Sequence, residues 1–411
     1  MMLPRAGRAC LLLAAIAMHR GLFAQHVEPG PPGAALSQDS FRLELRPFDV
    51  RYMQPALSFL TEPATSPSDV KALYVNAWAF SSPKLWNLVR LADSTEINAL
   101  VIDVKDDTGC LLYPSQVPTA DRVGANRCRR LSAPDMRARL DTLRAHGIYA
   151  IARVVIAKDP LLAEGKPRWS VQDRAGGLWR DRIGSAWVDA FHDSIWVYSA
   201  DLAAEAVRLG FNEVQFDYVR FPDEPRERMA MAIFSARRAG DTQRAAVRRN
   251  VAMLQRRLEP LGVPVTFDIF GLTASATGDL GIGQVWEDFS LVADVILPMV
   301  YPSHYYAGAY GFARPNAHPY QVVRHALTEA LDRSRHAEAA QIRPYLQAFT
   351  LGRRLPRYTP HEIREQIRAT EDLGLTSWVL WNPRSVYQRD ALRPYVTQPH
   401  PAPVLLIGES Q

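Results

Sequence analysis

The chain has 411 residues, of which 47% are hydrophobic and 22% charged, so it can bury a large core and is not expected to be disordered. Lys and Arg number 48 against 43 Asp and Glu, a formal net charge of +5, and no basic run reaches five residues. This weak and scattered excess argues against a nucleic-acid partner.

The first 25 residues have the pattern of a secretory signal peptide. Arg5 and Arg8 precede a short apolar stretch at 9–18, and Leu22-Phe23-Ala24 places a small residue before a cleavage point. The stretch is too short to span a membrane. We therefore expect a mature protein that is secreted or periplasmic, with no stable membrane span.

Two proline-rich segments flank the expected domain. Residues 26–68 form a leader or linker with seven prolines, and residues 396–411 form a C-terminal tail. The region between them, 69–395, is expected to hold one folded domain.

Short apolar runs and helical patterns alternate through this region. Eight runs are typical of strands: 72–76, 99–104, 149–156, 213–219, 264–270, 294–300, 343–349 and 377–381. Helical patterns separate most of them: 83–94, 134–146, 194–209, 242–259 (after a possible Asp241 cap) and 360–373. Eightfold strand–helix alternation predicts an α/β fold, a (β/α)₈ TIM barrel with long loops on its C-terminal face. An open doubly wound sheet is the rival, but the first run lacks the Gly-rich turn of that fold.

Polar residues share one face of the expected strands. Asp103 and Lys105 alternate with apolar neighbours, as do Arg153, Asp217, Asp268 and Gln347 in later strands. In a barrel this face points into the lumen, and its C-terminal end is where active sites of the fold lie. A buried layer of mutually paired charges, for example Arg153 with Asp103, is the structural alternative.

Asp217 and Asp268 end the fourth and fifth strands and are expected to lie close together. Glycoside hydrolysis needs such a pair, one carboxylate to attack or activate water and one to protonate the leaving oxygen. Asp106 and Asp107 add carboxylates after the second strand, where a turn cap is the alternative role.

Aromatic residues gather in the segments that follow the strands. Trp78, Tyr301 and Trp381 are candidates for sugar platforms, because flat rings suit the apolar faces of sugars. His304, after the sixth strand, is a candidate for a hydrogen bond to substrate.

Other chemistries lack their motifs. The chain has no H-x-H at its first strand, no H-E-x-x-H, no G-x-S-x-G and no phosphate-binding G-x-x-x-x-G-K-[ST]. We expect neither a metal nor a cofactor.

Several long motifs resemble one bacterial family. They are VIDVKDD (101–107), IYAIARVV (148–155), KDPL (158–161), EVQFDYVRFP (213–222) and PMVYPSHY (298–305). Across about 70–387 the chain resembles the family called the putative glycoside hydrolase domain, which is similar to TIM-barrel glycosidases of the α-amylase-like superfamily.

The resemblance implies hydrolysis of an α-glycosidic bond, with a fourth-strand Asp, here Asp217, as nucleophile. Two positions depart from the amylase-type pattern: Asp268 stands where those enzymes carry an acidic Glu, and Gln215 where they tend to carry Arg. The expected catalytic residues are Asp217 and Asp268. The expected substrate-binding residues are Asp103, Asp107, Arg153, Arg220, His304, Tyr301, Trp78 and Trp381.

The sequence thus predicts an exported glycosidase acting on a poly- or oligosaccharide, with a carbohydrate as its partner and a cell-envelope glycan as a candidate substrate. A catalytically silent barrel that binds envelope glycans is the alternative. Cys110 and Cys128 are expected to lie close enough to bridge, with free thiols left open as the other reading.

Overall fold

The computed structural model describes residues 67–335, 338–352 and 356–395. The predicted signal peptide (1–25), nearly all of the leader (26–68) and the tail (396–411) lie outside these residues. The predictions for those segments therefore remain predictions.

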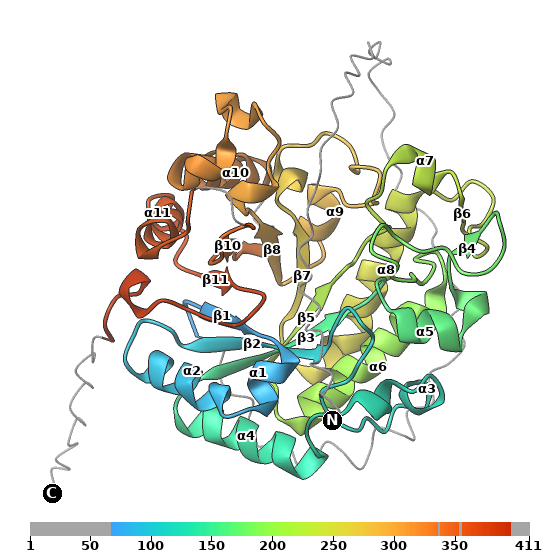
Figure 1. Ribbon diagram of the computed structural model, residues 1–411, viewed down its shortest axis with the longest axis horizontal. Helices are drawn as coiled ribbons and strands as arrows, with labels where there is room; N and C mark the ends of the chain where they lie inside the picture. The colour runs from blue at the N-terminus through green and yellow to red at the C-terminus, as the bar shows by residue number, and fades with distance from the viewer. Residues whose placement is uncertain (1–66, 336–337, 353–355, 396–411) are drawn as a thin grey trace, which may run out of the picture. The chain divides into compact units, whose positions relative to one another are not determined.

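Parallel strands form the centre of the fold (Figure 1). Their bounds are β1 (Lys71–Val75), β2 (Ala99–Lys105), β3 (Tyr149–Val155), β5 (Glu213–Asp217), β7 (Val265–Phe270), β8 (Val295–Met299), β9 (Gln341–Ile342), β10 (Tyr345–Gln347) and β11 (Trp378–Trp381). Pro344, which has no N–H for the ladder, separates β9 from β10, so these two segments are halves of one barrel strand.

The sheet closes on itself. Neighbouring strands follow the order β10-β11-β1-β2-β3-β5-β7-β8, and β10 also pairs with β8 at Tyr345 and Met299. All eight predicted strands are present, and the closed (β/α)₈ barrel is confirmed.

Each connection between barrel strands carries a helix, and these helices surround the strands in Figure 1. They are α2 (Lys84–Asp93), α4 (Ala133–Ala145), α6 (Asp193–Leu209), α8 (Gln243–Leu258), α9 (Trp286–Ser290), α10 (Pro319–Arg333) and α11 (Pro360–Glu371). Short helices α1 (Ala77–Ser81), α3 (Pro118–Arg122), α5 (Pro160–Gly165) and α7 (Arg226–Met229) lie in the loops. Within the described ranges no helix is both long and apolar enough to cross a membrane.

The helix ends follow local chemistry. The predicted Asp241 cap is wrong: Thr242 caps α8 by accepting the backbone N–H of Ala245, at 3.1 Å. Gly210 ends α6 with φ 117°, a left-handed conformation that costs glycine no steric clash.

Two apolar layers hold the barrel. One large cluster fills the space between the strands and the helices, and a smaller one fills the lumen with residues such as Ala72, Val101, Ile151 and Leu297. This inner layer closes the barrel below the C-terminal ends of the strands, so the polar residues above it stand on a packed floor.

One predicted orientation is wrong. The pairing of β2 with β3 shifts register between Asp103 and Lys105, which is a bulge. The Lys105 ammonium consequently lies 2.7 Å from Asp159 and over the ring of Tyr198 in α6, both contacts separate from the Asp103 carboxylate.

A small loop module follows β3 and β5. Its antiparallel strands β4 (Gln172–Asp173) and β6 (Ala232–Ile233) lie beside α7 at the right of Figure 1. Trp179 and Trp187 form its buried core with Val171 and Ala157. The module thus extends the C-terminal face of the barrel next to β5.

Cys110 and Cys128 form a disulfide, with Cα atoms 5.4 Å apart, which confirms their predicted proximity. The bond closes a loop between residues separated by 18 positions, after β2.

We expect the double substitution Cys110→Ser, Cys128→Ser to lower the free energy of unfolding by about 3 kcal/mol, because the unfolded chain regains the entropy of that loop. Urea denaturation of the oxidised protein and the double variant measures the difference. A reduced wild-type protein is the matched control, and equal stability of all three forms would contradict the prediction.

Candidate active site

A single arginine gathers three carboxylates at the C-terminal ends of adjacent strands. Arg153, in β3, donates from Nη1 to Asp103 at 2.5 Å and from Nη2 to Asp217, and its Nε lies 3.7 Å from Asp268. The carboxylates come from β2, β5 and β7, as the strand parity predicted. We call Asp103, Arg153, Asp217 and Asp268 the acidic cluster.

Asp268 is the most enclosed carboxylate of the cluster, with 1% of its surface exposed. Its Oδ2 accepts from Gln215 Nε2 at 3.0 Å, and the same amide donates to the Tyr345 hydroxyl at 2.7 Å. Its Oδ1 has no partner among the described residues. Burial raises the pKa of Asp268 well above its ordinary 3.8, and the neighbouring charge of Asp217 raises it further.

Asp103 is also buried, and its surroundings have opposing effects on its pKa. Burial raises the pKa of Asp103 to about 6, although Arg153 and a hydrogen bond from Tyr74 oppose that rise. The Tyr74 hydroxyl donates to Asp103 Oδ2 at 2.5 Å. Asp103 thus ties β1 to the acidic cluster.

The backbone is strained directly after Asp217. Tyr218 has φ 53°, a left-handed conformation that is uncommon for a residue with a bulky side chain. Its backbone N–H donates to Asp217 Oδ1 at 2.5 Å, while Arg153 holds Oδ2. The two oxygens of Asp217 are therefore fixed in position from both sides.

Beside Asp217 a row of alternating cationic and aromatic groups extends toward the loop module. Lys158 pairs with Asp107 at 2.8 Å and lies over the Tyr218 ring, and Arg220 lies over the same ring. The predicted site residues Asp107 and Arg220 therefore lie beside the acidic cluster. Arg220 contacts the Tyr218 ring directly, and Asp107 is connected to that ring through Lys158. Asp106 has the alternative role: it accepts the backbone N–H of Thr108 within the turn.

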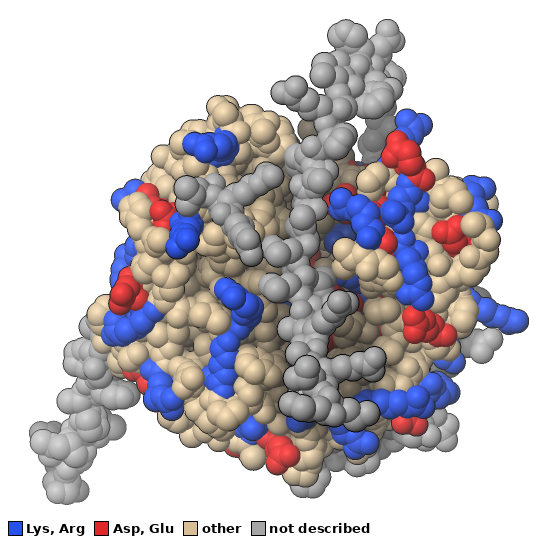
Figure 2. Space-filling model, in the orientation of Figure 1, with Lys and Arg blue, Asp and Glu red and all other residues tan. Residues whose placement is uncertain are grey.

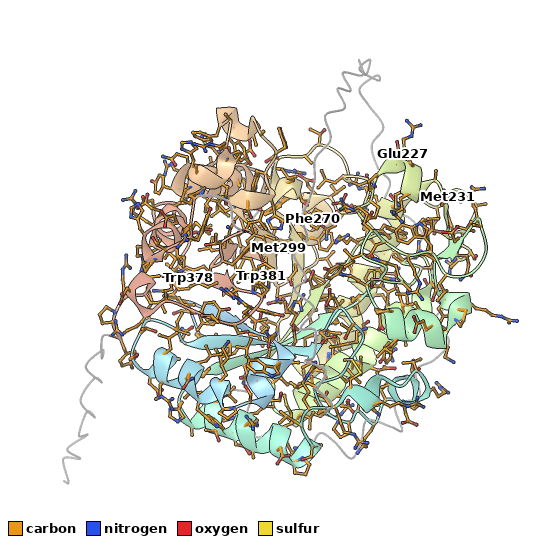
Figure 3. The ribbon with its side chains drawn as sticks, in the orientation of Figure 1. Glu227, Met231, Phe270, Met299, Trp378 and Trp381 are labelled. Carbon is orange, nitrogen blue, oxygen red and sulfur yellow. A yellow bond between two sulfur atoms is a disulfide. The ribbon has the colours of Figure 1, made fainter. Side chains whose placement is uncertain are left out.

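Rings on the other side of the barrel form an aromatic wall of Tyr74, Tyr301, His304, Phe349 and Trp381. Trp381 stacks on Tyr301 with ring centroids 5.3 Å apart and an interplanar angle of 25°. It also lies 6.1 Å from the Tyr74 ring and 5.1 Å from the Phe349 ring. Trp381 and Met299, both labelled in Figure 3, are partly buried and pack against the apolar cluster of the lumen. This wall brings Tyr301, His304 and Trp381 together beside Tyr74, and so beside the acidic cluster.

His304 packs against Tyr301 with ring centroids 5.2 Å apart. Burial lowers the pKa of His304 to about 4, so the imidazole is neutral at pH 7. It therefore contributes hydrogen-bonding capacity to the wall without adding charge.

Trp78 lies apart from these groups. It belongs to α1, the helix after β1. Its side chain is 60% exposed, and the Lys84 ammonium lies over its ring. With Trp86, Asn87 and Arg90 it lines a cavity of about 550 Å³ beside α2. No described contact joins Trp78 to the acidic cluster.

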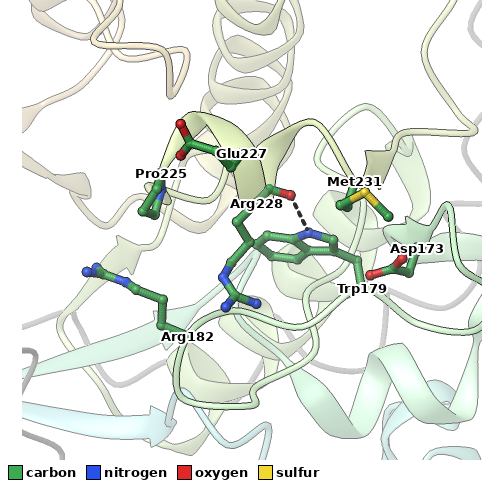
Figure 4. A pocket seen from close by; sticks show the side chains of 7 residues that line it. All are labelled: Asp173, Trp179, Arg182, Pro225, Glu227, Arg228 and Met231. Atoms are coloured by element: carbon green, nitrogen blue, oxygen red, sulfur yellow. Dashed lines mark hydrogen bonds between the residues drawn. The ribbon is translucent and has the colours of Figure 1, made fainter. Parts of the chain in front are cut away.

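A second cavity, of about 420 Å³, lies in the loop module (Figure 4). Trp179 lines it and donates its indole N–H to the carbonyl of Arg228 at 3.0 Å. Arg182 and Arg228 also line it, and both pair with Glu224. At the right of Figure 2, over the loop module, Lys and Arg are interspersed with Asp and Glu. The surface of the module is therefore mixed in charge.

Tyr74, Gln215 and Tyr345 belong to the site and were absent from the predicted site residues. Each lies on the inward parity of its strand, which is the signal that could have found them. Sequence parity identifies the face, but the partner of a side chain across the lumen depends on barrel closure. Within the described ranges no group of three or more His, Cys, Asp or Glu is arranged to hold a metal ion.

The match of the chain to known families agrees with this geometry. Residues 72–387 match the family described as "Putative glycosyl hydrolase domain". The chain belongs to this family. It is therefore a carbohydrate-acting hydrolase and is classed with the glycosidases.

Two solved structures are similar to parts of this chain. The glycoside hydrolase domain of PgaB (BpsB) from Bordetella bronchiseptica is 16% identical, with TM-score 0.52, over 80% of this chain and 99% of that one. A hypothetical protein from Ruminiclostridium thermocellum is 34% identical, with TM-score 0.43, over 48% of this chain and 96% of that one. No curated protein matches significantly.

Proposed function

We propose that this glycosidase cleaves its substrate with Asp217 as the nucleophile, or as the charge that stabilises the transition state, and Asp268 as the acid. One observation carries the proposal: both carboxylates contact the same guanidinium at the mouth of a glycosidase barrel, yet differ in environment. Paired carboxylates in different environments divide the work of glycoside hydrolysis.

Asp217 has the environment that a nucleophile needs. Its side chain is 10% exposed against 1% for Asp268, and Arg153 donates to it directly. A carboxylate that is held in position and paired with a guanidinium can attack an anomeric carbon or stabilise the positive charge that develops there.

Asp268 has the environment that an acid needs. Its raised pKa keeps the carboxyl protonated to a higher pH than an ordinary aspartate. Oδ2 accepts from Gln215 and faces Arg153, so the proton belongs on Oδ1, the atom without a protein partner among the described residues. A leaving-group oxygen is the acceptor we assign to it.

The purified protein should release new reducing ends from a glycan of a broad panel, and the Asp217→Asn variant should not. Release that is undiminished in the variant would contradict the assignment. Glycan binding by both proteins without any release would favour the silent, glycan-binding barrel instead.

The aromatic wall is the proposed sugar platform. We expect Trp381→Ala to raise KM about tenfold to hundredfold with a smaller change in kcat, because a stacked ring contributes binding in ground and transition states alike. Steady-state kinetics on the glycan identified above measures both constants. Trp86→Ala, which removes an indole beside α2, is the matched control; equal effects of the two substitutions would argue against a platform.

Export to the periplasm or the medium, with a cell-envelope or extracellular glycan as substrate, completes the proposal. The pattern of residues 1–25 supports it, and so does the disulfide, since such bonds persist in oxidising compartments. Fractionation of the native host with mass spectrometry of the N-terminus tests export: a mature end near residue 26 outside the cytoplasm is expected, and an intact cytoplasmic chain would contradict it.

A further inference from the structure

Five cationic side chains are buried within the described residues: Lys105, Arg153, Lys158, Arg220 and Arg343. Four of them form ion pairs, with Asp159, the acidic cluster, Asp107 and Glu213 respectively. Arg220, at 9% exposure, is the exception, because no carboxylate of the described residues lies within ion-pair distance of it. A desolvated cation without a counter-charge is costly, so this exception needs an explanation.

Aromatic rings enclose the Arg220 guanidinium. Its Cζ lies 4.6 Å from the ring centroid of Phe270, 4.8 Å from that of Tyr218 and 5.2 Å from that of Trp187. Cation–π attraction from these rings offsets part of the desolvation cost. It also leaves the in-plane N–H groups as the directions in which Arg220 can still bind.

One N–H group of the Arg220 guanidinium has a hydrogen-bond partner, and others do not. Nη1 donates to the carbonyl of Phe221 at 2.9 Å. Nε and Nη2 have no hydrogen bond to any described residue, and together they form the edge that holds a planar carboxylate through two parallel bonds.

The position of Arg220 in the barrel also agrees with a role in substrate binding. Its ring partners come from the segment after β3, the residue after β5 and the end of β7, all on the C-terminal side of the barrel. Phe270 lies near the centre of the view in Figure 3 and pairs in register with Met299 of β8. Tyr218, which covers Arg220, also donates its backbone N–H to Asp217.

We propose that Arg220 binds the carboxylate of a uronic acid residue, so that the substrate is an acidic glycan. This inference rests on the proposed function, since it names the substrate class of the same site. Even with Asp268 protonated as the acid, the acidic cluster sets two carboxylates, Asp103 and Asp217, against one guanidinium and by itself repels an acidic sugar. Lys158 is already neutralised by Asp107, which leaves Arg220 as the buried cation that counters this repulsion.

Binding to the Asp217→Asn variant tests the proposal without turnover. The ligands are short oligosaccharides of polygalacturonate, hyaluronan and alginate, each paired with its carboxyl-reduced counterpart, in which the acid is a hydroxymethyl group. We expect at least one acidic oligosaccharide to bind about tenfold or more tightly than its reduced form. No preference in any of the pairs would overturn the proposal.

Substitutions assign that preference to the residue. Arg220→Gln should abolish the preference, and Arg220→Lys should keep only part of it, because an ammonium lacks the planar fork. Arg244→Gln, which removes an arginine paired with Asp288 and without a described contact to Arg220 or the acidic cluster, is the matched control and should change nothing. An unchanged preference in Arg220→Gln, or tighter binding of a sulfated than of a uronic oligosaccharide, would contradict the carboxylate assignment.

Different results would contradict the catalytic proposal and the proposal that Arg220 binds a carboxylate. If the wild-type protein prefers the acidic forms but cleaves no glycan, the catalytic proposal fails and this one stands. If it cleaves a neutral glycan through Asp217 and shows no carboxylate preference, this inference alone fails. If the Arg220 variants do not fold, as judged by near-UV circular dichroism, the paired ligands on the Asp217→Asn variant still decide.

Discussion

Asp217→Asn should lower kcat/KM on the cleaved glycan by on the order of 10⁴-fold, because the amide can neither attack the anomeric carbon nor carry the negative charge that stabilises it. The fold should survive the change, since Arg153 keeps Asp103 and Asp268 as partners. Substrate binding should also remain, because the aromatic wall is untouched. Steady-state kinetics and equilibrium binding on the same preparation measure the two effects.

The control for this substitution is Asp288→Asn. Asp288, in α9, is a similarly enclosed aspartate that pairs with Arg244 and has no described contact with the acidic cluster. Its loss should affect stability and leave kcat/KM close to that of the wild type. If Asp217→Asn keeps near-full activity, the nucleophile is elsewhere, whatever the fate of the control.

Asp268→Asn should have an effect that depends on the leaving group. On a natural glycan we expect a loss of about 10²- to 10⁴-fold, because the departing sugar oxygen needs a proton. On an aryl glycoside with an acidic phenol the loss should be much smaller, since that oxygen leaves unprotonated. An equal loss on both substrates would remove Asp268 as the acid and make Asp106 or Asp107 the next candidate.

The pH dependence should change with the same substitution. Because the proton on Asp268 is needed, wild-type kcat/KM should fall as the pH rises through the elevated pKa of this carboxyl. The Asp268→Asn variant has no such proton, and its basic limb should disappear. A basic limb that persists unchanged in the variant would assign it to another group.

At neutral pH the Asp268→Asn substitution should raise stability although it lowers activity. The folded-state pKa of Asp268 lies above its unfolded value, so the unfolded chain ionises first as the pH rises, and wild-type stability falls between the unfolded and folded pKa values. Below both values Asp268→Asn should match the wild type, and at neutral pH it should be the more stable protein. Urea denaturation at acidic and neutral pH measures the difference, and a variant that is less stable at neutral pH would contradict the sign.

Much of the fold is encoded locally. The eight apolar runs and the helical patterns between most of them predicted the barrel, because strand length, parity and helical periodicity depend on neighbours in the sequence. The same parity placed Asp103, Arg153, Asp217 and Asp268 on one face. The helices α9 and α10 were not among the predicted helical patterns, although the barrel needed a connection at each of those places.

Local patterns predicted the position of Lys105 wrongly for a physical reason. Its alternation with Asp103 holds only while β2 keeps a regular register, and the bulge between them depends on pairing with β3. The ion pair of Lys105 with Asp159 is a contact of tertiary packing that no repeat in the sequence specifies.

The sequence by itself determined that Asp103, Arg153, Asp217 and Asp268 face the lumen and that the chain carries enough carboxylates for glycoside chemistry. Only the tertiary structure decided the partners of each charged group. Arg153 contacts three carboxylates from three strands, and Gln215 donates to Asp268 and to Tyr345 beside it. Arg220 is enclosed by aromatic rings and has no ion-pair partner among the described residues. The reason is that parity fixes a direction, whereas burial and partners across the lumen are set by closure of the sheet and by loops from distant segments. Those are the quantities that control the proton affinity of a carboxylate and the specificity of a cation.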